Sequence, residues 1–222
     1  MRVHNRRRIS RQKYSILYAG FVADIAAITV AKIAHVNRKT ADRYYRIFRE
    51  VILIAARTER REQNLHNGIE LDESYFGAKR IRGKRGRGAG GKIIVFGLLK
   101  REGSVYTQIV SSAQRAELMP IIRRVVASGS EIYSDGWRSY DALAIYGYNH
   151  KKVRHAENEF AREDGTHING VESYWSWMKR RLHKFNGIPK EQFTNHMIES
   201  EWRFNHRSTL ARDLKKLLRL LS

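Results

Sequence analysis

The sequence predicts an α/β protein in which a mixed β-sheet is flanked by helices and preceded by a helical region. Three observations support this fold class. Residues 14–56 are rich in Ala, Ile, Leu and Val with few helix breakers, and residues 69–110 hold three short β-prone runs. Residues 113–135 continue with a helical period and a fourth β-prone run. Hairpin strands followed by a crossover helix and a further strand are typical of a mixed sheet.

Composition points to a polyanionic partner. The 222 residues carry 43 Lys and Arg against 22 Asp and Glu, a formal net charge of +21, which favours nucleic acid over an anionic membrane surface. No apolar run reaches the roughly 18 residues needed to cross a bilayer. We therefore expect a soluble cytoplasmic protein associated with the nucleoid. The chain has no cysteine, which excludes disulfides, a thiol nucleophile and a cysteine-based zinc site.

Residues 1–56 are expected to form a basic arm and a helix-turn-helix-like DNA-binding region. A first helix over 14–36 is followed by a polar turn and a basic amphipathic helix over 41–54. In a helix-turn-helix, the start of the second helix would reach base edges. The residues expected there are Arg38, Lys39, Thr40 and Arg43. The alternative is a helical hairpin that packs on the catalytic core.

Three segments are expected to lie outside the folded cores. Residues 57–68 are polar and mixed in charge, which indicates a linker, and residues 208–222 form a leucine-rich basic tail that covers the core or mediates self-association. Residues 77–91 are glycine-rich and basic, typical of a loop that either is solvated or tracks the DNA backbone. Its basic residues are Lys79, Arg80, Arg82, Lys84, Arg85 and Arg87.

Acidic residues stand out in three later elements. Asp72 lies within a β-prone run over 69–76, and period-2 alternation puts Asp72 and Glu73 on opposite faces. Asp135 ends the β-prone run that begins at residue 131. Near residue 169 a helix begins in which Glu172 lies one turn after Asn169. Asp72, Asp135 and Glu172 therefore form a candidate acidic triad.

The remaining elements complete the predicted sheet and its helices. Further strands are expected over 92–100, 104–110 and 152–155, and helices over 113–127 and 190–206. Pro120 implies that the first of these helices either starts near this residue or kinks there. Trp175 is expected to pack in the core.

Several motifs together resemble the DDE transposases and, more closely, the ISXO-like insertion-sequence transposases. The resemblance covers residues 69–207 and is carried by the segments 72–77, 134–135 with Tyr140 following, 167–175 and 202–205. It implies a ribonuclease-H-like catalytic domain over 69–207 and Mg²⁺- or Mn²⁺-dependent chemistry with two ions. The sequence departs from some such relatives in lacking an N-terminal cysteine zinc ribbon.

The resemblance also assigns roles. Asp72, Asp135 and Glu172 would be the catalytic metal ligands, with Asn169 as the alternative third ligand, and Lys179 and Arg180 would hold terminal phosphates. The implied activity is binding of double-stranded DNA at terminal inverted repeats, cleavage there, and joining of the 3′-OH ends to target DNA by a homodimer or larger assembly. The alternatives are a ribonuclease-H-like or resolvase-type nuclease without strand transfer, and a non-catalytic helix-turn-helix regulator.

Overall fold

The computed structural model covers the whole chain and describes residues 9–77, 92–101, 103–135, 143–153 and 168–220. It divides into two compact units. A helical unit combines Met1–Arg61 with Arg181–Ser222, and a sheet unit spans Glu62–Arg180. The basic arm up to residue 8 and the six basic residues predicted in the 77–91 loop lie outside the described residues.

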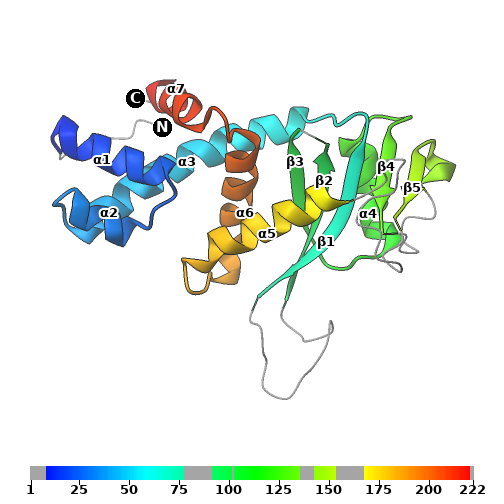
Figure 1. The fold of residues 1–222 in the computed structure, drawn as a ribbon, viewed down its shortest axis with the longest axis horizontal. Helices are drawn as coiled ribbons and strands as arrows, with labels where there is room; N and C mark the ends of the chain where they lie inside the picture. Colours follow the sequence, from blue (N-terminus) through cyan, green and yellow to red (C-terminus); the bar gives the residue numbers. More distant parts are fainter. Residues whose placement is uncertain (1–8, 78–91, 102, 136–142, 154–167, 221–222) are drawn as a thin grey trace, which may run out of the picture. The chain divides into compact units, whose positions relative to one another are not determined.

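The sheet unit contains five strands, one complete helix and the first part of another (Figure 1). In chain order these are β1 (Ile69–Phe76), β2 (Ile93–Lys100), β3 (Val105–Val110), α4 (Arg115–Val125), β4 (Glu131–Ser134), β5 (Asn149–Lys152) and α5 (Asn169–His183). The strand order is β3-β2-β1-β4-β5, in which β1 pairs antiparallel with β2 and parallel with β4. The mixed sheet predicted from the sequence is confirmed.

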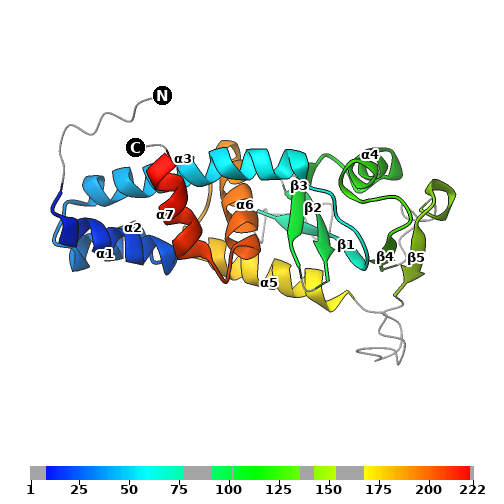
Figure 2. The same ribbon diagram turned by 90° about the horizontal axis from the view of Figure 1, so that it is seen from above.

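The two faces of β1 differ as period-2 alternation requires. Ile69 and Leu71 belong to an apolar core that includes Leu118 and Ile122 of α4. From the opposite face, the Phe76 ring packs edge-on against Trp175 of α5, with ring centroids 6.0 Å apart. Figure 2 shows α4 and α5 on opposite sides of the sheet. Asp72 lies on the face covered by α5 because it is an even number of residues from Phe76.

Some predicted boundaries in this unit change. Helix α4 begins at Arg115 and carries Pro120 inside it on an exposed side, so a helix start at Pro120 is wrong. The preceding loop is held by Glu117, whose carboxylate accepts hydrogen bonds from the backbone N–H groups of Ser111 and Ser112 at 2.6 and 2.8 Å. The fifth strand lies at Asn149–Lys152, earlier than the predicted 152–155.

The helical unit holds α1 (Arg11–Val22), α2 (Ala27–Ile33), α3 (Arg38–Glu62), α6 (Lys190–Asn205), α7 (Leu210–Leu220) and the end of α5. The single helix predicted over 14–36 is wrong. Asp24 takes a left-handed backbone conformation with φ of 58° and ends the first helix. A Cβ atom on Gly20 would lie 2.4 Å from Val30 Cγ2, so this glycine lets α1 and α2 pack closely.

Helix α3 supplies the apolar face that the sequence predicts. Tyr44, Tyr45 and Phe48 are buried, and Phe21 of α1 packs edge-on against Tyr45 at 5.0 Å between ring centroids. The helix continues to Glu62, so the first half of the predicted linker over 57–68 is helical. Aromatic burial between α1 and α3 therefore forms the core of this unit.

Helix α7 covers the aromatic core of the helical unit. Covering a core was one of the two roles predicted for the C-terminal tail, the other being self-association. Leu214 is fully buried, and the Tyr18 hydroxyl of α1 donates a hydrogen bond to the backbone carbonyl of Ala211. None of the helices in the described part of the chain combines the length and apolar character needed to cross a bilayer.

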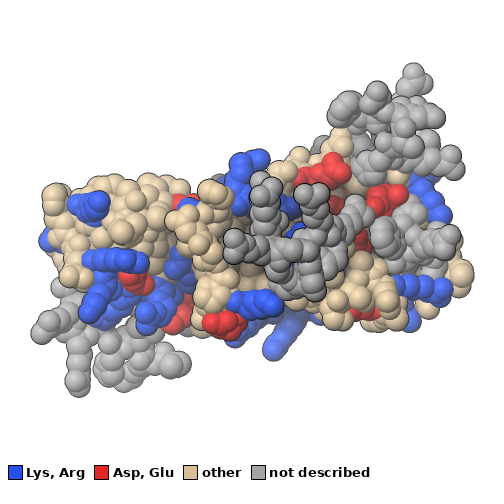
Figure 3. All heavy atoms as spheres, turned by 90° about the horizontal axis from the view of Figure 1, so that it is seen from below, with Lys and Arg blue, Asp and Glu red and all other residues tan. Residues whose placement is uncertain are grey.

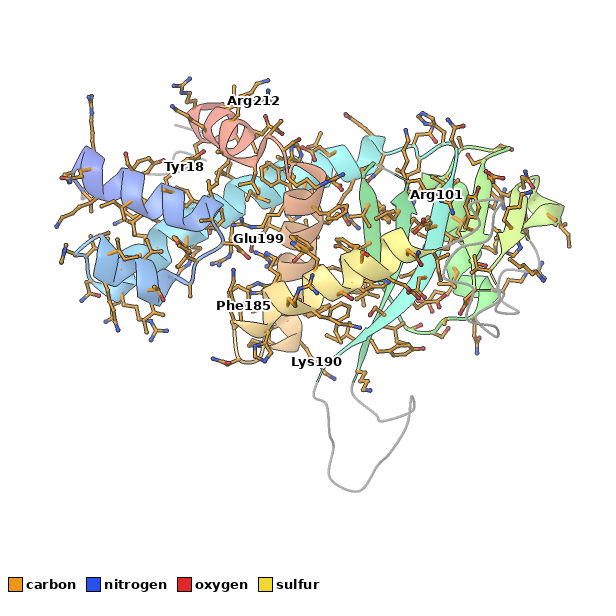
Figure 4. The ribbon with its side chains drawn as sticks, viewed as in Figure 1. Tyr18, Arg101, Phe185, Lys190, Glu199 and Arg212 are labelled. Atoms are coloured by element: carbon orange, nitrogen blue, oxygen red, sulfur yellow. The ribbon has the colours of Figure 1, made fainter. Side chains whose placement is uncertain are left out.

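A buried carboxylate connects three helices of the helical unit. Glu199 on α6, labelled in Figure 4, pairs with Arg49 of α3 at 3.0 Å, Arg181 of α5 at 2.7 Å and Arg203 of α6 at 2.9 Å. Asp24 accepts a further ion pair from Arg181 at 3.2 Å. Burial would raise the pKa of the Glu199 carboxyl, but the three guanidinium charges hold it well below its usual range.

Replacing Glu199 with Ala should lower the free energy of unfolding by about 3–5 kcal/mol, because three guanidinium groups would lose their buried counter-charge. Urea denaturation followed by circular dichroism measures the change. The control is Glu191→Ala in the first turn of the same helix, where the side chain is exposed, and a loss below about 0.5–1 kcal/mol is expected. Equal effects of the two substitutions would contradict a structural role for the buried cluster.

Candidate active site

The pairing of β1 with β4 brings two predicted acidic residues to the same edge. The parallel register pairs Ile69 with Ile132 and Glu70 with Tyr133. Asp72 and Asp135 each lie two residues further along these strands. Because side chains two residues apart share a face, Asp72 and Asp135 lie side by side on the face covered by α5.

A glycine on β2 lets α5 approach this edge. Gly97 pairs with Asp72 across the β1–β2 ladder, and a Cβ atom there would lie only 2.4 Å from Cζ2 of Trp175. The Trp175 ring therefore occupies the space that a side chain at residue 97 would fill. Trp175 is buried, which confirms its predicted place in the core.

The three carboxylates of the candidate triad influence one another. The pKa of Asp72 is raised to about 6, chiefly by burial and further by the negative charges of Asp135 and Glu172. The backbone N–H of Glu73 opposes the shift, as does the Trp175 indole. The indole N–H stabilises the ionised form of the Asp72 carboxyl, although it does not meet the distance and angle criteria for a hydrogen bond. The structure therefore brings Asp135 and Glu172 within electrostatic range of Asp72.

The helix side of the candidate site is exposed to solvent. Glu172 lies in the first turn of α5 and Asn169 is the first residue of that helix, and both are exposed. Among the described residues, no three His, Asp or Glu side chains lie close enough together to hold a metal ion. The donor set nevertheless fits Mg²⁺ or Mn²⁺ chemically, because these cations prefer carboxylate and amide oxygens. A cation would also relieve the repulsion that raises the pKa of Asp72.

Two predicted phosphate-binding residues follow on the same helix. Lys179 and Arg180 are exposed at the end of the sheet unit, and Lys179 Nζ lies 5.6 Å from the centroid of the Phe76 ring. Figure 3 shows Lys and Arg side chains in several clusters on one face, with Asp and Glu side chains between them.

The predicted DNA-reading residues open α3 in the helical unit. The Asn37 side chain accepts a hydrogen bond from the backbone N–H of Lys39 at 2.8 Å, as a helix N-cap does. Arg38 and Lys39 are exposed, whereas Thr40 and Arg43 are partly buried. The short helix α2, a turn and α3 therefore follow one another in the order that a helix-turn-helix requires.

A mixed sheet with carboxylates at one edge suits the metal-dependent chemistry of nucleases and transposases. Among these enzymes, the family described as "ISXO2-like transposase domain" matches residues 64–205, more than half of the chain. The chain belongs to this transposase family, and the resemblance seen in the sequence is confirmed.

Relatives agree with this assignment. An uncharacterized transposase-like protein of Haemophilus influenzae is 46% identical over 102 residues, which cover 46% of this chain and 81% of that protein. Among solved structures, the Mos1 strand transfer complex matches with 12% identity and a TM-score of 0.33, covering 99% of this chain and 81% of that one. A Mos1 paired-end complex with the left transposon end gives 12% identity and a TM-score of 0.31, with the same coverage. The family assignment rests on the two sequence matches.

In metal-free protein, the Asp72 carboxyl should titrate near pH 6, and Asp135→Asn or Glu172→Gln should each lower this pKa without restoring the ordinary value, because burial remains. The folded state then binds a proton that the unfolded state has already lost. The free energy of unfolding should therefore fall as pH rises from about 4 to about 6, by on the order of 2 kcal/mol.

Carboxyl-detected NMR with EDTA present measures the pKa values, and urea denaturation across this pH range measures the stability. Glu131→Gln on β4 is the control, since Glu131 is not among the causes of the shift. If neither Asp135→Asn nor Glu172→Gln changed the pKa of Asp72, the three carboxylates would not lie close together.

Proposed function

We propose that this protein is the DNA transposase of an insertion sequence, which cleaves at the element ends and joins the resulting 3′-OH ends to target DNA. The observation that supports this function best is that the charges of Asp135 and Glu172 act on Asp72 at one edge of the sheet, within the segment that matches the transposase family. A regulator that only binds DNA has no need of carboxylates gathered in this way.

Each carboxylate has a distinct structural setting. Asp72 is held in a mostly buried position on the central strand, Asp135 follows the end of the adjacent strand, and Glu172 reaches the same edge from an exposed turn of α5. Together they would hold two Mg²⁺ or Mn²⁺ ions. When bound, such ions neutralise phosphate charge, activate a water molecule and stabilise the leaving oxygen.

Asn169 is the alternative third ligand. It lies one helical turn before Glu172 and offers an amide oxygen. Glu172 is the better candidate because its charge already acts on Asp72, whereas Asn169 has no charge to contribute. Lys179 and Arg180, further along the same helix, would hold the terminal phosphates through charge-assisted hydrogen bonds.

End recognition is assigned to the helical unit. The exposed Arg38 and Lys39 at the start of α3 are suited to contact DNA, with Thr40 and Arg43 beside them on the same helix. The glycine-rich basic segment over 77–91 would add contacts to phosphates. Since two element ends must be joined together, the active form would be a homodimer or larger assembly on DNA.

Asp72→Asn, Asp135→Asn and Glu172→Gln should each reduce cleavage of linear DNA bearing the terminal inverted repeats by roughly 100-fold or more in Mg²⁺, because a metal-ligating charge is lost. Binding of the DNA ends should persist. A gel assay that resolves nicked, cleaved and joined products measures both steps.

The matched control is Glu73→Gln, which removes a carboxylate from the opposite face of the same strand and should leave activity unchanged. Full activity of Glu172→Gln together with inactive Asn169→Ala would assign the third ligand to Asn169. Cleavage without joined products would favour the nuclease, and binding that persists in EDTA without any cleavage would favour the regulator.

Arg38→Ala combined with Lys39→Ala should weaken binding of end DNA and reduce the salt dependence of binding by about one to two released counter-ions. Fluorescence anisotropy between 50 and 200 mM salt measures this slope. The control is Lys32→Ala in the last turn of α2, which is also exposed. Unchanged affinity and slope in the double variant would contradict DNA contact at the start of α3.

A further inference from the structure

We propose that Glu70 is a positioning residue that fixes the start of α5, and with it Glu172, against the two strands that carry Asp72 and Asp135. This role rests on the proposed transposase function. Glu70 lies two residues before Asp72 on β1, on the same face, and is only 1% exposed. In the sequence, Glu70, Asp72 and Glu73 are all acidic residues in one β-prone run, and nothing there gives Glu70 a different role.

The Glu70 carboxylate binds the first turn of α5 directly. Its Oε2 atom accepts a buried hydrogen bond from the backbone N–H of Val171 at 2.9 Å. Backbone N–H groups in the first turn of a helix have no partner within the helix, and they carry the positive end of the helix dipole. A carboxylate is therefore a favourable partner at this point. The residue that follows Val171 is Glu172, so the contact lies directly beside the proposed metal ligand.

A glycine makes the close approach possible. A Cβ atom on Gly170 would lie 2.8 Å from Glu70 Oε2 and 2.9 Å from Leu99 Cδ2. A larger residue would clash with both side-chain ends, so either the Glu70 and Leu99 side chains or the start of α5 would have to shift. The need for this contact therefore accounts for a glycine in the first turn of a helix, where it otherwise costs about 1 kcal/mol relative to Ala.

The other oxygen of Glu70 connects to the strand of Asp135. Glu70 Oε1 accepts a hydrogen bond from Arg101 Nε at 3.2 Å, and the Arg101 guanidinium stacks 3.5 Å from the centroid of the Tyr133 ring. Tyr133 lies two residues before Asp135 and pairs with Glu70 across the β1–β4 ladder. The three elements that carry the acidic triad therefore meet at Glu70.

Glu70 and Tyr133 each lie two residues before a member of the acidic triad on the same strand path, so their contacts lie behind the acidic edge. Residues that orient metal ligands from behind typically change metal affinity or activity 10–100-fold when they are replaced. A purely structural ion pair behaves differently, because exchange of a buried pair for apolar residues of similar size is often neutral for stability. These two expectations separate positioning from simple stabilisation.

The test uses the full chain with three changes: Glu70→Gln, the double change Glu70→Leu with Arg101→Leu, and Gly170→Ala. The double change removes the buried charges as a pair and should keep most of the stability. Gly170→Ala keeps the Glu70 carboxyl but crowds its contact with the first turn of α5. Glu62→Gln, at an exposed position of the sheet unit, is the control for loss of a carboxylate.

Two readouts apply to each variant after its unfolding midpoint is measured in urea. One is the apparent affinity for Mn²⁺, measured by electron paramagnetic resonance without DNA. The other is the rate of Mg²⁺-dependent cleavage of DNA bearing the terminal inverted repeats, with end binding measured in parallel.

We expect the double variant and Gly170→Ala to stay folded and to bind DNA ends, while Mn²⁺ affinity and cleavage each fall by about 10–100-fold. If the folded double variant kept wild-type Mn²⁺ affinity and cleavage, the positioning role of Glu70 would be overturned, while the proposed function would stand. The positioning role would also be overturned if the losses of Mn²⁺ affinity and cleavage were no larger than the fraction of unfolded protein in each variant. Wild-type protein that neither binds Mn²⁺ nor cuts DNA would overturn the proposed function, and this role with it.

Discussion

The sheet unit depends on one buried contact between a strand and a helix. The Glu70 carboxylate receives the first-turn N–H of Val171 on one side and the Arg101 guanidinium on the other. A buried carboxylate is costly unless it is fully hydrogen-bonded and paired, so this geometry leaves little freedom in how α5 meets β1. Helix α5 then follows β1 closely enough for Trp175 to take the space above Gly97.

The helical unit uses the same principle at another position. Glu199 is buried among three arginines contributed by α3, α5 and α6. In a chain with a formal net charge of +21, an acidic residue has cationic partners available on almost any neighbouring element. Burial of single carboxylates among arginines joins the helices of this unit while its outer surface remains basic. That surface suits a protein whose partner is a polyanion.

The acidic edge is the exception to this pattern. The charges that act most strongly on Asp72 are those of Asp135 and Glu172, and its pKa is raised to about 6 as a result of burial and of these like charges. Two carboxylate charges that raise the pKa of a third would be relieved by a cation, which agrees with the metal site proposed above. The family assignment and the proposed chemistry both agree with such a site.

The sequence by itself determined the order of strands and helices, the face of β1 that holds Asp72, and the buried face of α3, because alternation and helical periodicity depend only on near neighbours along the chain. The motifs that resemble the transposase family were visible for the same reason. Local pattern did not show the break at Asp24, since no Gly or Pro marks it, nor the extension of α3 to Glu62.

Only the tertiary structure decided which distant residues meet. It showed that α6 and α7 pack with the N-terminal helices in one compact unit. It also separated Glu70, which is buried and bound to α5, from Asp72, which faces the open edge. The two residues have the same charge and lie on the same face of one strand. Their different roles come from partners 31 and 101 residues away along the chain, Arg101 and Val171, which no local period encodes.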